Sequence, residues 1–142
     1  PDGEYTIPIG QADIKREGED ATVVAIGPMV QKSLDAAVTL EDDGYDIEVV
    51  DPRSLSPLDV DTICTSVRKT GRAIVCGEDS TFAGAASEIA AMISENCFSD
   101  LKGPVRRIGS PHVPMPFSSE LVKHVVPEKS HVIDAVNQSM AA

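Results

Sequence analysis

Charged and hydroxyl side chains gather in the segment EVVDPRSLSPLDVDTI, residues 48–63, between an apolar run and the start of an amphipathic one. Asp51 and Arg53 lie at the carboxyl end of an expected buried strand, where open α/β sheets usually bind ligands. An ion pair or a turn hydrogen bond is the competing interpretation of these two residues. Ser56 or Asp59 fits the capping position of the helix that follows. The segment is therefore either a ligand site or the corner between a strand and a helix.

Two further strand ends carry residues that could do chemistry. Gly27 precedes a helix N-terminus, which can hold an anion, but one glycine is far from the G-x-G-x-x-G pattern, and the chain has no Walker A motif. Glu78 and Asp79 could share acid and base roles, yet adjacent residues of a strand face opposite sides. Gly27, Asp51 and Glu78 together define one alternative function, a stand-alone small-ligand or nucleotide-binding module. A serine or cysteine hydrolase is a weaker alternative, because no G-x-S-x-G motif is present.

The histidines and cysteines do not have the spacing of a metal site. The histidines are His112, His124 and His131, and the cysteines are Cys64, Cys76 and Cys97. No pair follows the spacing of a zinc motif. Because each cysteine lies among apolar residues, we expect buried free thiols and a reducing compartment, the bacterial cytoplasm or the mitochondrial matrix. His112 lies in the proline-rich stretch GSPHVPMPF, which is either a stiff, exposed recognition loop or a plain structural loop, and spacing alone favours the latter.

Length and charge restrict the class of protein. The 142 residues fit a single domain over 1–142, without a linker or a repeat. The net charge of −11 argues against partners such as nucleic acid or anionic membrane and permits a basic protein partner. We expect no spanning helix and no signal peptide. Because the first residue is not Met, we expect a fragment or a processed product of a longer chain.

Apolar patterning predicts alternating strands and helices. Strands are expected at 21–27, 45–52, 72–77 and 104–109, and an edge strand at 12–18. Helices are expected at 28–44, 60–71, 82–98, 118–126 and 130–140, with Val30, Leu34, Ala37 and Val38 on the buried face of the first. Such alternation favours a three-layer α/β/α fold with a mostly parallel sheet.

Five stretches in this order resemble a known family. They are IPIGQADIKREGEDATVVAIGPMV, IEVVDPRSLSPLD, SVRKTGRAIVCGE, SEIAAMISENCF and PVRRIGSPHVPMPF. Together they resemble the C-terminal domain of the beta subunit of thiamine diphosphate-dependent 2-oxo acid dehydrogenases, of the pyruvate, branched-chain and acetoin type. The chain departs from the family pattern in TFAGAASE, where a glycine-rich stretch is usual, and in GSPH before the P-x-P loop.

The resemblance implies a fold and a division of labour. The fold is transketolase C-terminal domain-like, with a five-stranded mixed sheet whose first strand is antiparallel to the rest. The parent enzyme decarboxylates pyruvate or a related 2-oxo acid, or cleaves acetoin, and passes the acyl group to lipoyl. Its thiamine diphosphate lies between the alpha subunit and the preceding domain of the beta subunit, and a GDG…N motif holds the diphosphate and Mg²⁺. No GDG occurs here, so we expect no catalytic, cofactor or metal residue in this chain and no activity of it in isolation.

The resemblance also implies partners. The family forms α2β2 heterotetramers that receive the basic subunit-binding domain of a lipoyl acyltransferase, which the acidic balance of this chain suits. The residues expected at partner contacts or at the wall of the substrate channel are Arg53, Glu88, His112, Pro114, Pro116 and Phe117.

Overall fold

The computed structural model of the protein describes residues 4–141. Its strands are β1 (Asp13–Arg16), β2 (Ala21–Ala25), β3 (Ile47–Asp51), β4 (Ala73–Ser80) and β5 (Arg106–Ser110). Its helices are α1 (Met29–Asp42), α2 (Val60–Thr70), α3 (Ala85–Cys97), α4 (Ser119–Val122) and α5 (Lys129–Met140), with a 3-10 turn at Phe98–Asp100. No helix among residues 4–141 has the length and apolar character needed to cross a bilayer.

The strands form one sheet in the order β1-β3-β2-β4-β5. The strands β2 to β5 run parallel, and β1 pairs antiparallel with β3 at one edge. Parallel neighbours need a crossover connection, which α1, α2 and α3 supply. The predicted mixed, mostly parallel sheet and its antiparallel edge strand are therefore confirmed.

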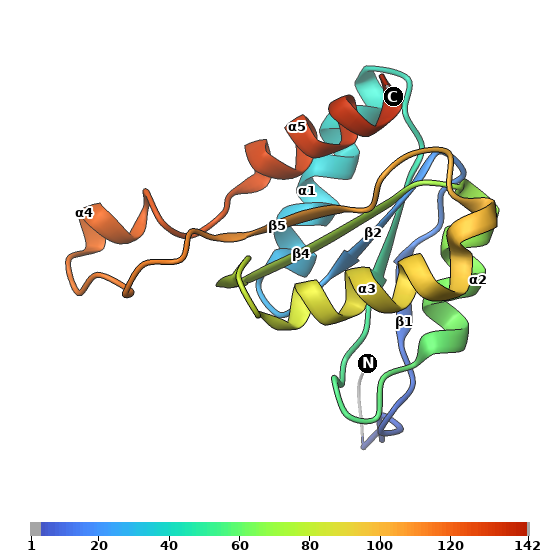
Figure 1. Cartoon of the computed structure of the whole chain (residues 1–142), viewed down its shortest axis with the longest axis horizontal. Helices are drawn as coiled ribbons and strands as arrows, with labels where there is room; N and C mark the ends of the chain where they lie inside the picture. The colour runs from blue at the N-terminus through green and yellow to red at the C-terminus, as the bar shows by residue number, and fades with distance from the viewer. Residues whose placement is uncertain (1–3, 142) are drawn as a thin grey trace.

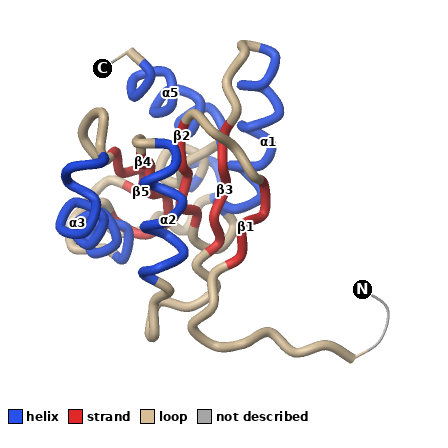
Figure 2. Tube along the Cα trace, turned by 90° about the vertical axis from the view of Figure 1, so that its right-hand side faces the viewer, coloured by secondary structure: helices blue, strands red, loops and turns tan. Residues whose placement is uncertain are grey.

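Helices cover both faces of the sheet (Figure 2). Successive residues of a strand point to opposite faces, so each central strand serves two cores. Val23 packs in the core that α1 and α5 cover, whereas its neighbour Val24 packs in the core that α2 and α3 cover. Both side chains are fully buried, and burial of such a side chain contributes about 1.5–3 kcal/mol. The domain thus holds two complete apolar cores.

One segment leaves this body. Residues 111–126, which we call the arm, project from the carboxyl end of β5 and carry α4 near their tip (Figure 1). The chain then returns at Pro127, a buried residue, and continues as α5.

Three local predictions are wrong. The helix expected over 118–126 is a single turn, α4, followed by turns, because it lacks the tertiary packing that stabilises a short helix. The helix expected from residue 82 begins only at Ala85, because Ala83 has a left-handed φ of 56°. Val38, expected on the buried face of α1, is 64% exposed.

Candidate functional site

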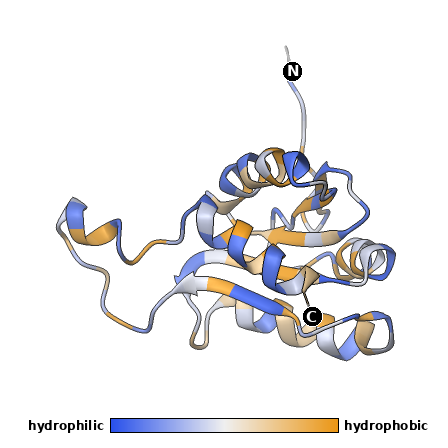
Figure 3. Cartoon of the chain, turned by 90° about the horizontal axis from the view of Figure 1, so that it is seen from above, coloured by the Kyte–Doolittle hydropathy of each residue, from blue (hydrophilic) through white to orange (hydrophobic). Residues whose placement is uncertain are grey.

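The arm carries large apolar side chains in solvent. These are Val113, Met115, Phe117 and Leu121, and Figure 3 shows the apolar stretches along the arm. Phe117 is fully exposed. Neither apolar core of the described chain includes a residue of 111–126. Each of these side chains therefore adds little to the fold, and an exposed group of this kind marks an interaction surface.

Prolines shape the first half of the arm. Pro111, Pro114 and Pro116 lack a backbone N–H and have a fixed φ, so this stretch cannot continue β5 or form the interior of a helix. The fixed torsions also lower the entropy that the segment loses when a partner orders it. At the base of the arm, the His112 ring lies against Phe82, with ring centroids 4.7 Å apart. The sequence thus builds a stiff, exposed segment anchored at its root.

Lys32 on α1 fixes the returning end of the arm. Its Nζ donates to the Pro127 carbonyl oxygen at 2.8 Å and lies 3.1 Å from Oε1 of Glu78 and 3.3 Å from Oε1 of Glu128. Burial disfavours the charged ammonium, but the hydrogen bonds to Glu78 and Glu128 outweigh that effect and raise the pKa of Lys32. Lys32 therefore joins α1, the end of β4 and the start of α5 at the root of the arm.

A second exposed apolar segment precedes β1. Its large side chains are Tyr5, Ile7 and Ile9. Because β1 is antiparallel to β3, with Asp13 opposite Asp51, this segment enters at the carboxyl end of β3. Its backbone is held there from Gly10 onwards, where the Gly10 N–H donates to Ser54 Oγ at 3.1 Å.

Asp59 holds the same entry point and caps α2. One carboxylate oxygen accepts from the Ala12 N–H at 2.9 Å, and the other accepts from the Thr62 N–H at 3.1 Å. Burial disfavours the carboxylate, but these backbone hydrogen bonds outweigh it and lower the pKa of Asp59. Of the two capping residues that the sequence offers, the structure uses Asp59 and not Ser56.

Hydrogen bonds within the domain engage Asp51 and Arg53 at the corner that follows β3. Arg53 has a left-handed φ of 58°, and its N–H donates to Oδ1 of Asp51 at 2.9 Å. Its guanidinium donates to Oδ2 of Asp13 on β1 at 2.7 Å. The ion-pair and turn-bond interpretation of these residues is thus confirmed, and Arg53 braces the edge strand. Its predicted contact with a partner remains a prediction.

The remaining strand ends do not converge on a ligand. Glu78 pairs with Lys32 on the α1 side, whereas Asp79 lies toward Gly84 at the start of α3. The two carboxylates therefore face opposite sides, as the strand geometry predicts.

Glu88 lies apart from the arm and the corner. It is exposed on the first turn of α3, where a carboxylate stabilises the helix dipole. The predicted contact residues thus occupy three places. His112, Pro114, Pro116 and Phe117 share the arm, Arg53 lies after β3, and Glu88 lies on α3.

Sequence reasoning identified Phe117 on the arm but missed the other exposed apolar residues of the arm. Met115 alternates with the predicted contact residues Pro114 and Pro116, and the sequence pattern places Leu121 in an amphipathic helix. The available signal was the run of prolines, which excludes this stretch from strands and helices and leaves its apolar residues without an internal place. Lys32 was also missed, because its partners lie 46 and 96 residues away in the sequence.

The opposite, amino end of the sheet holds a buried polar cluster. Glu48 on β3 is 0% exposed and accepts from Ser66 Oγ, from Lys69 Nζ and from the Gly18 N–H. Thr22 Oγ1 adds a hydrogen bond to Ser66 Oγ at 2.8 Å. The hydrogen bond to Glu48 raises the pKa of Lys69 to about 12. All these polar groups are thus satisfied inside the domain.

An acidic rim borders this cluster, in the connection between β1 and β2 and from the end of α1 to the start of β3. It consists of Glu17, Glu19, Asp20, Glu41, Asp42, Asp43 and Asp46. Its two segments are joined by backbone bonds, since the N–H groups of Glu19 and Asp20 donate to the Asp46 carbonyl oxygen at 3.0 and 2.8 Å. Arg16 neutralises part of the rim through ion pairs with Glu41 and Asp46, each at 3.2 Å. Net negative charge remains at this end of the sheet.

The cysteines are poor nucleophiles. All three are buried free thiols, as predicted. Burial raises the pKa of Cys76 to about 12, and it also raises the pKa of Cys64 to about 11. Neither thiol carries meaningful thiolate at neutral pH, which argues against the cysteine hydrolase alternative.

Comparison with known proteins assigns the fold to a family. Residues 10–132 match the family "Transketolase, C-terminal domain". The chain belongs to this family. Among solved structures, this transketolase C-terminal domain superposes on a split gene transketolase, an inactive beta4 tetramer, with a TM-score of 0.80 and 29% identity over 97% of this chain and 44% of that one. The resemblance stated from the sequence motifs is therefore confirmed.

Its curated relatives are beta subunits. It is 45% identical over 133 residues to the acetoin:2,6-dichlorophenolindophenol oxidoreductase subunit beta of Bacillus subtilis, a match that covers 94% of this chain and 39% of the relative. It is 50% identical over 118 residues to the pyruvate dehydrogenase E1 component subunit beta of the same organism, which covers 83% of this chain and 36% of the relative. The transketolase C-terminal domain thus spans about two fifths of the length of such relatives.

The residues of this domain do not fit a thiamine diphosphate and Mg²⁺ site. The sequence has no GDG motif. Within residues 4–141, no three His, Cys, Asp or Glu side chains gather in a geometry that could hold a metal ion. The carboxylates at the carboxyl ends of the strands are engaged with neighbours, Asp51 with Arg53 and Glu78 with Lys32.

Proposed function

We propose that this chain is the C-terminal assembly domain of the beta subunit of a thiamine diphosphate-dependent 2-oxo acid dehydrogenase. The parent enzyme would oxidise pyruvate or a related 2-oxo acid, or acetoin, and transfer the acyl group to lipoyl. The cofactor and Mg²⁺ would be held by other parts of that enzyme, and this domain would supply contacts. The observation that carries the proposal is the apolar arm, whose exposed side chains lie beside a body with two complete cores.

The arm is the proposed contact with a neighbouring subunit. Phe117 offers an aromatic side chain of the kind enriched at interfaces, Leu121 adds apolar area beside it, and the prolines keep the ordering cost low. The neighbour would be the alpha subunit or the second beta subunit of an α2β2 assembly. The exposed residues before Gly10 add apolar surface at the same carboxyl end of the sheet.

The acidic rim is the proposed contact with the basic subunit-binding domain of the lipoyl acyltransferase. Charge complementarity raises the association rate of two proteins, and salt screens this attraction, so the enhancement falls as ionic strength rises. The rim and the arm lie at opposite ends of the strands, so both partners can bind one domain at the same time.

Binding of the purified chain to that subunit-binding domain tests the rim. We expect binding that weakens as salt is raised, and that weakens about tenfold in the variant Asp42→Lys/Asp43→Lys. Asp61→Lys/Glu95→Lys makes the same change of charge on α2 and α3 and should bind as the wild type does. Equal binding by both variants would show that the rim is not the binding surface for the subunit-binding domain.

Calorimetric titration with thiamine diphosphate and Mg²⁺ tests the division of labour. We expect no binding to the purified chain. Micromolar binding would show that the domain carries its own cofactor site and would overturn the assembly role.

A further inference from the structure

The strand β5 forms an open edge of the sheet. It is last in the strand order, and within residues 4–141 no other strand pairs with its outer side. In an edge strand, alternate residues direct their N–H and C=O groups outward, where an added strand can bond to them. The opposite edge strand, β1, is braced by ion pairs of Arg53 and Lys15 with Asp13.

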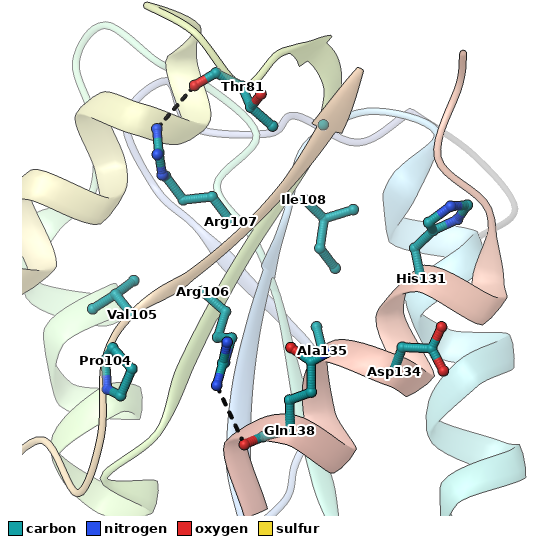
Figure 4. A pocket seen from close by; sticks show the side chains of 11 residues that line it. Thr81, Pro104, Val105, Arg106, Arg107, Ile108, His131, Asp134, Ala135 and Gln138 are labelled. Atoms are coloured by element: carbon teal, nitrogen blue, oxygen red, sulfur yellow. Dashed lines mark hydrogen bonds between the residues drawn. The ribbon is translucent and has the colours of Figure 1, made fainter. Parts of the chain in front are cut away.

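A groove runs along β5. On its α5 side lies a cavity of about 580 Å³, lined by Arg106, Ile108, Ala135 and Gln138 among others (Figure 4). On its α3 side lies a second cavity of about 780 Å³. The two share Pro104, Val105 and Arg107, so together they follow the strand edge continuously.

The two sides of the groove differ in chemistry. The α3 side has an apolar floor that includes Ala90, Ala91, Leu101 and Val105. The α5 side receives the guanidinium of Arg106, whose Nη2 donates to the Gln138 carbonyl oxygen at 3.4 Å. Such a pair of faces suits a strand whose side chains alternate between apolar and polar.

The groove is also basic in an acidic protein. Lys102, Arg106 and Arg107 have no carboxylate partner among residues 4–141, and donate only to carbonyl and hydroxyl oxygens. The Nε of Arg106 is buried and has no acceptor within the described residues. Asp134 is the only carboxylate among the lining residues of either cavity. Lys102 and Arg107 already donate to Thr70, Thr81 and Ser87, so Arg106 on the α5 side, with its unbonded Nε, is the cation that an acidic occupant would pair with.

The same arginines oppose pairing with a second copy. If two β5 strands joined edge to edge around a twofold axis near Arg106, basic side chains of one copy would lie across from those of the other. Like charges in facing positions destabilise a strand pair. The edge is thus protected from self-association but not from an acidic strand.

We propose that the β5 edge binds an extended acidic segment of a partner protein, which adds to the sheet as a sixth strand. Its acidic side chains face Arg106 on the α5 side, and its alternate apolar side chains lie on the α3 side. This site is distinct from the arm and from the acidic rim, and it does not depend on the proposed function.

A blocked, fluorescently labelled peptide of alternating Glu and Val residues tests the proposal by anisotropy with the purified chain. We expect saturable binding that is about tenfold weaker in Arg106→Gln, which loses one charge-assisted contact. Arg72→Gln removes an arginine that donates to the Ser139 carbonyl oxygen and lines neither cavity, and it should bind the peptide as the wild type does.

Two matched peptides keep the test independent of any variant. A Lys-Val peptide tests charge, and a Glu-Val peptide with N-methylated alternate amides tests strand pairing; both should fail to bind. Amide exchange in β5 should slow when the Glu-Val peptide is bound. Binding of either control peptide, unchanged exchange in β5, or dimerisation of the chain through β5 would overturn the proposal.

Discussion

The two ends of the sheet differ in which groups they bury and which they expose to solvent. At the amino end, the carboxylate of Glu48 is buried, and every bond that it needs comes from inside the domain. At the carboxyl end, Phe117 and its apolar neighbours on the arm lie in solvent with no core to join. Polar groups that could have remained in water are buried, and apolar groups that could have been buried are exposed.

The difference separates residues that stabilise the domain from residues of the proposed subunit contact. A buried, paired charge is costly to disturb, because removal of one partner leaves the other unsatisfied. An exposed apolar side chain contributes little to the free energy of unfolding, and its apolar surface is buried only when a partner covers it. We therefore expect substitutions at the amino end to change the free energy of unfolding more than substitutions on the arm, and substitutions on the arm to act on the proposed subunit contact.

Lys69→Met should have the largest effect on stability. It leaves the carboxylate of Glu48 buried without its cation, and we expect a loss of about 3 kcal/mol in the free energy of unfolding, measured with urea. Lys123→Met on the arm is the matched control and should change this free energy by less than about 0.5 kcal/mol. Equal effects of the two substitutions would remove the distinction between the ends of the sheet.

Alkaline pH should abolish part of the Lys69 effect. The pKa of Lys69 is about 12 in the folded chain against an ordinary value of 10.5, so its contribution is complete below pH 10.5 and is lost as pH rises through 12. We expect the difference in unfolding free energy between wild type and Lys69→Met to shrink by up to about 2 kcal/mol over this interval. A constant difference would show that the ammonium charge is not what stabilises Glu48.

Asp59→Ala should have a smaller effect on the free energy of unfolding. Asp59 lies at the carboxyl end of the sheet, where it holds the start of α2 and the segment before β1. It removes the cap of α2 and the acceptor for the Ala12 N–H, and we expect a loss of about 1–2 kcal/mol. Because the pKa of Asp59 is lowered, its contribution is present above pH 3.8 and is lost as pH falls through the folded-state pKa.

Two comparisons check the Asp59 prediction. Asp61→Ala, on the exposed first turn of the same helix, should cost less than about 0.5 kcal/mol. The unfolding free energies of Asp59→Ala and wild type should converge as the pH falls below 3.8 and passes through the lowered folded-state pKa of Asp59. Persistence of the full difference in acid would assign the effect to packing and not to the carboxylate.

The sequence predicts the layers well and the arm poorly. Apolar periodicity locates the central strands and helices because burial on two faces leaves a strong pattern, as in ATVVA over β2. It assigns Leu121 to a longer helix because a short amphipathic stretch has the same spacing whether or not anything packs on it. The cluster around Glu48 could not be predicted, since its members come from four separate segments.

The most direct test of the account is the free energy of unfolding of the double variant Phe117→Ser/Leu121→Ser. Because both side chains are exposed in the isolated domain, we expect the value to equal that of the wild type within about 0.5 kcal/mol. A loss above about 2 kcal/mol, the size expected when buried apolar side chains are removed, would show that the arm packs on its own domain and would contradict its assignment to a partner.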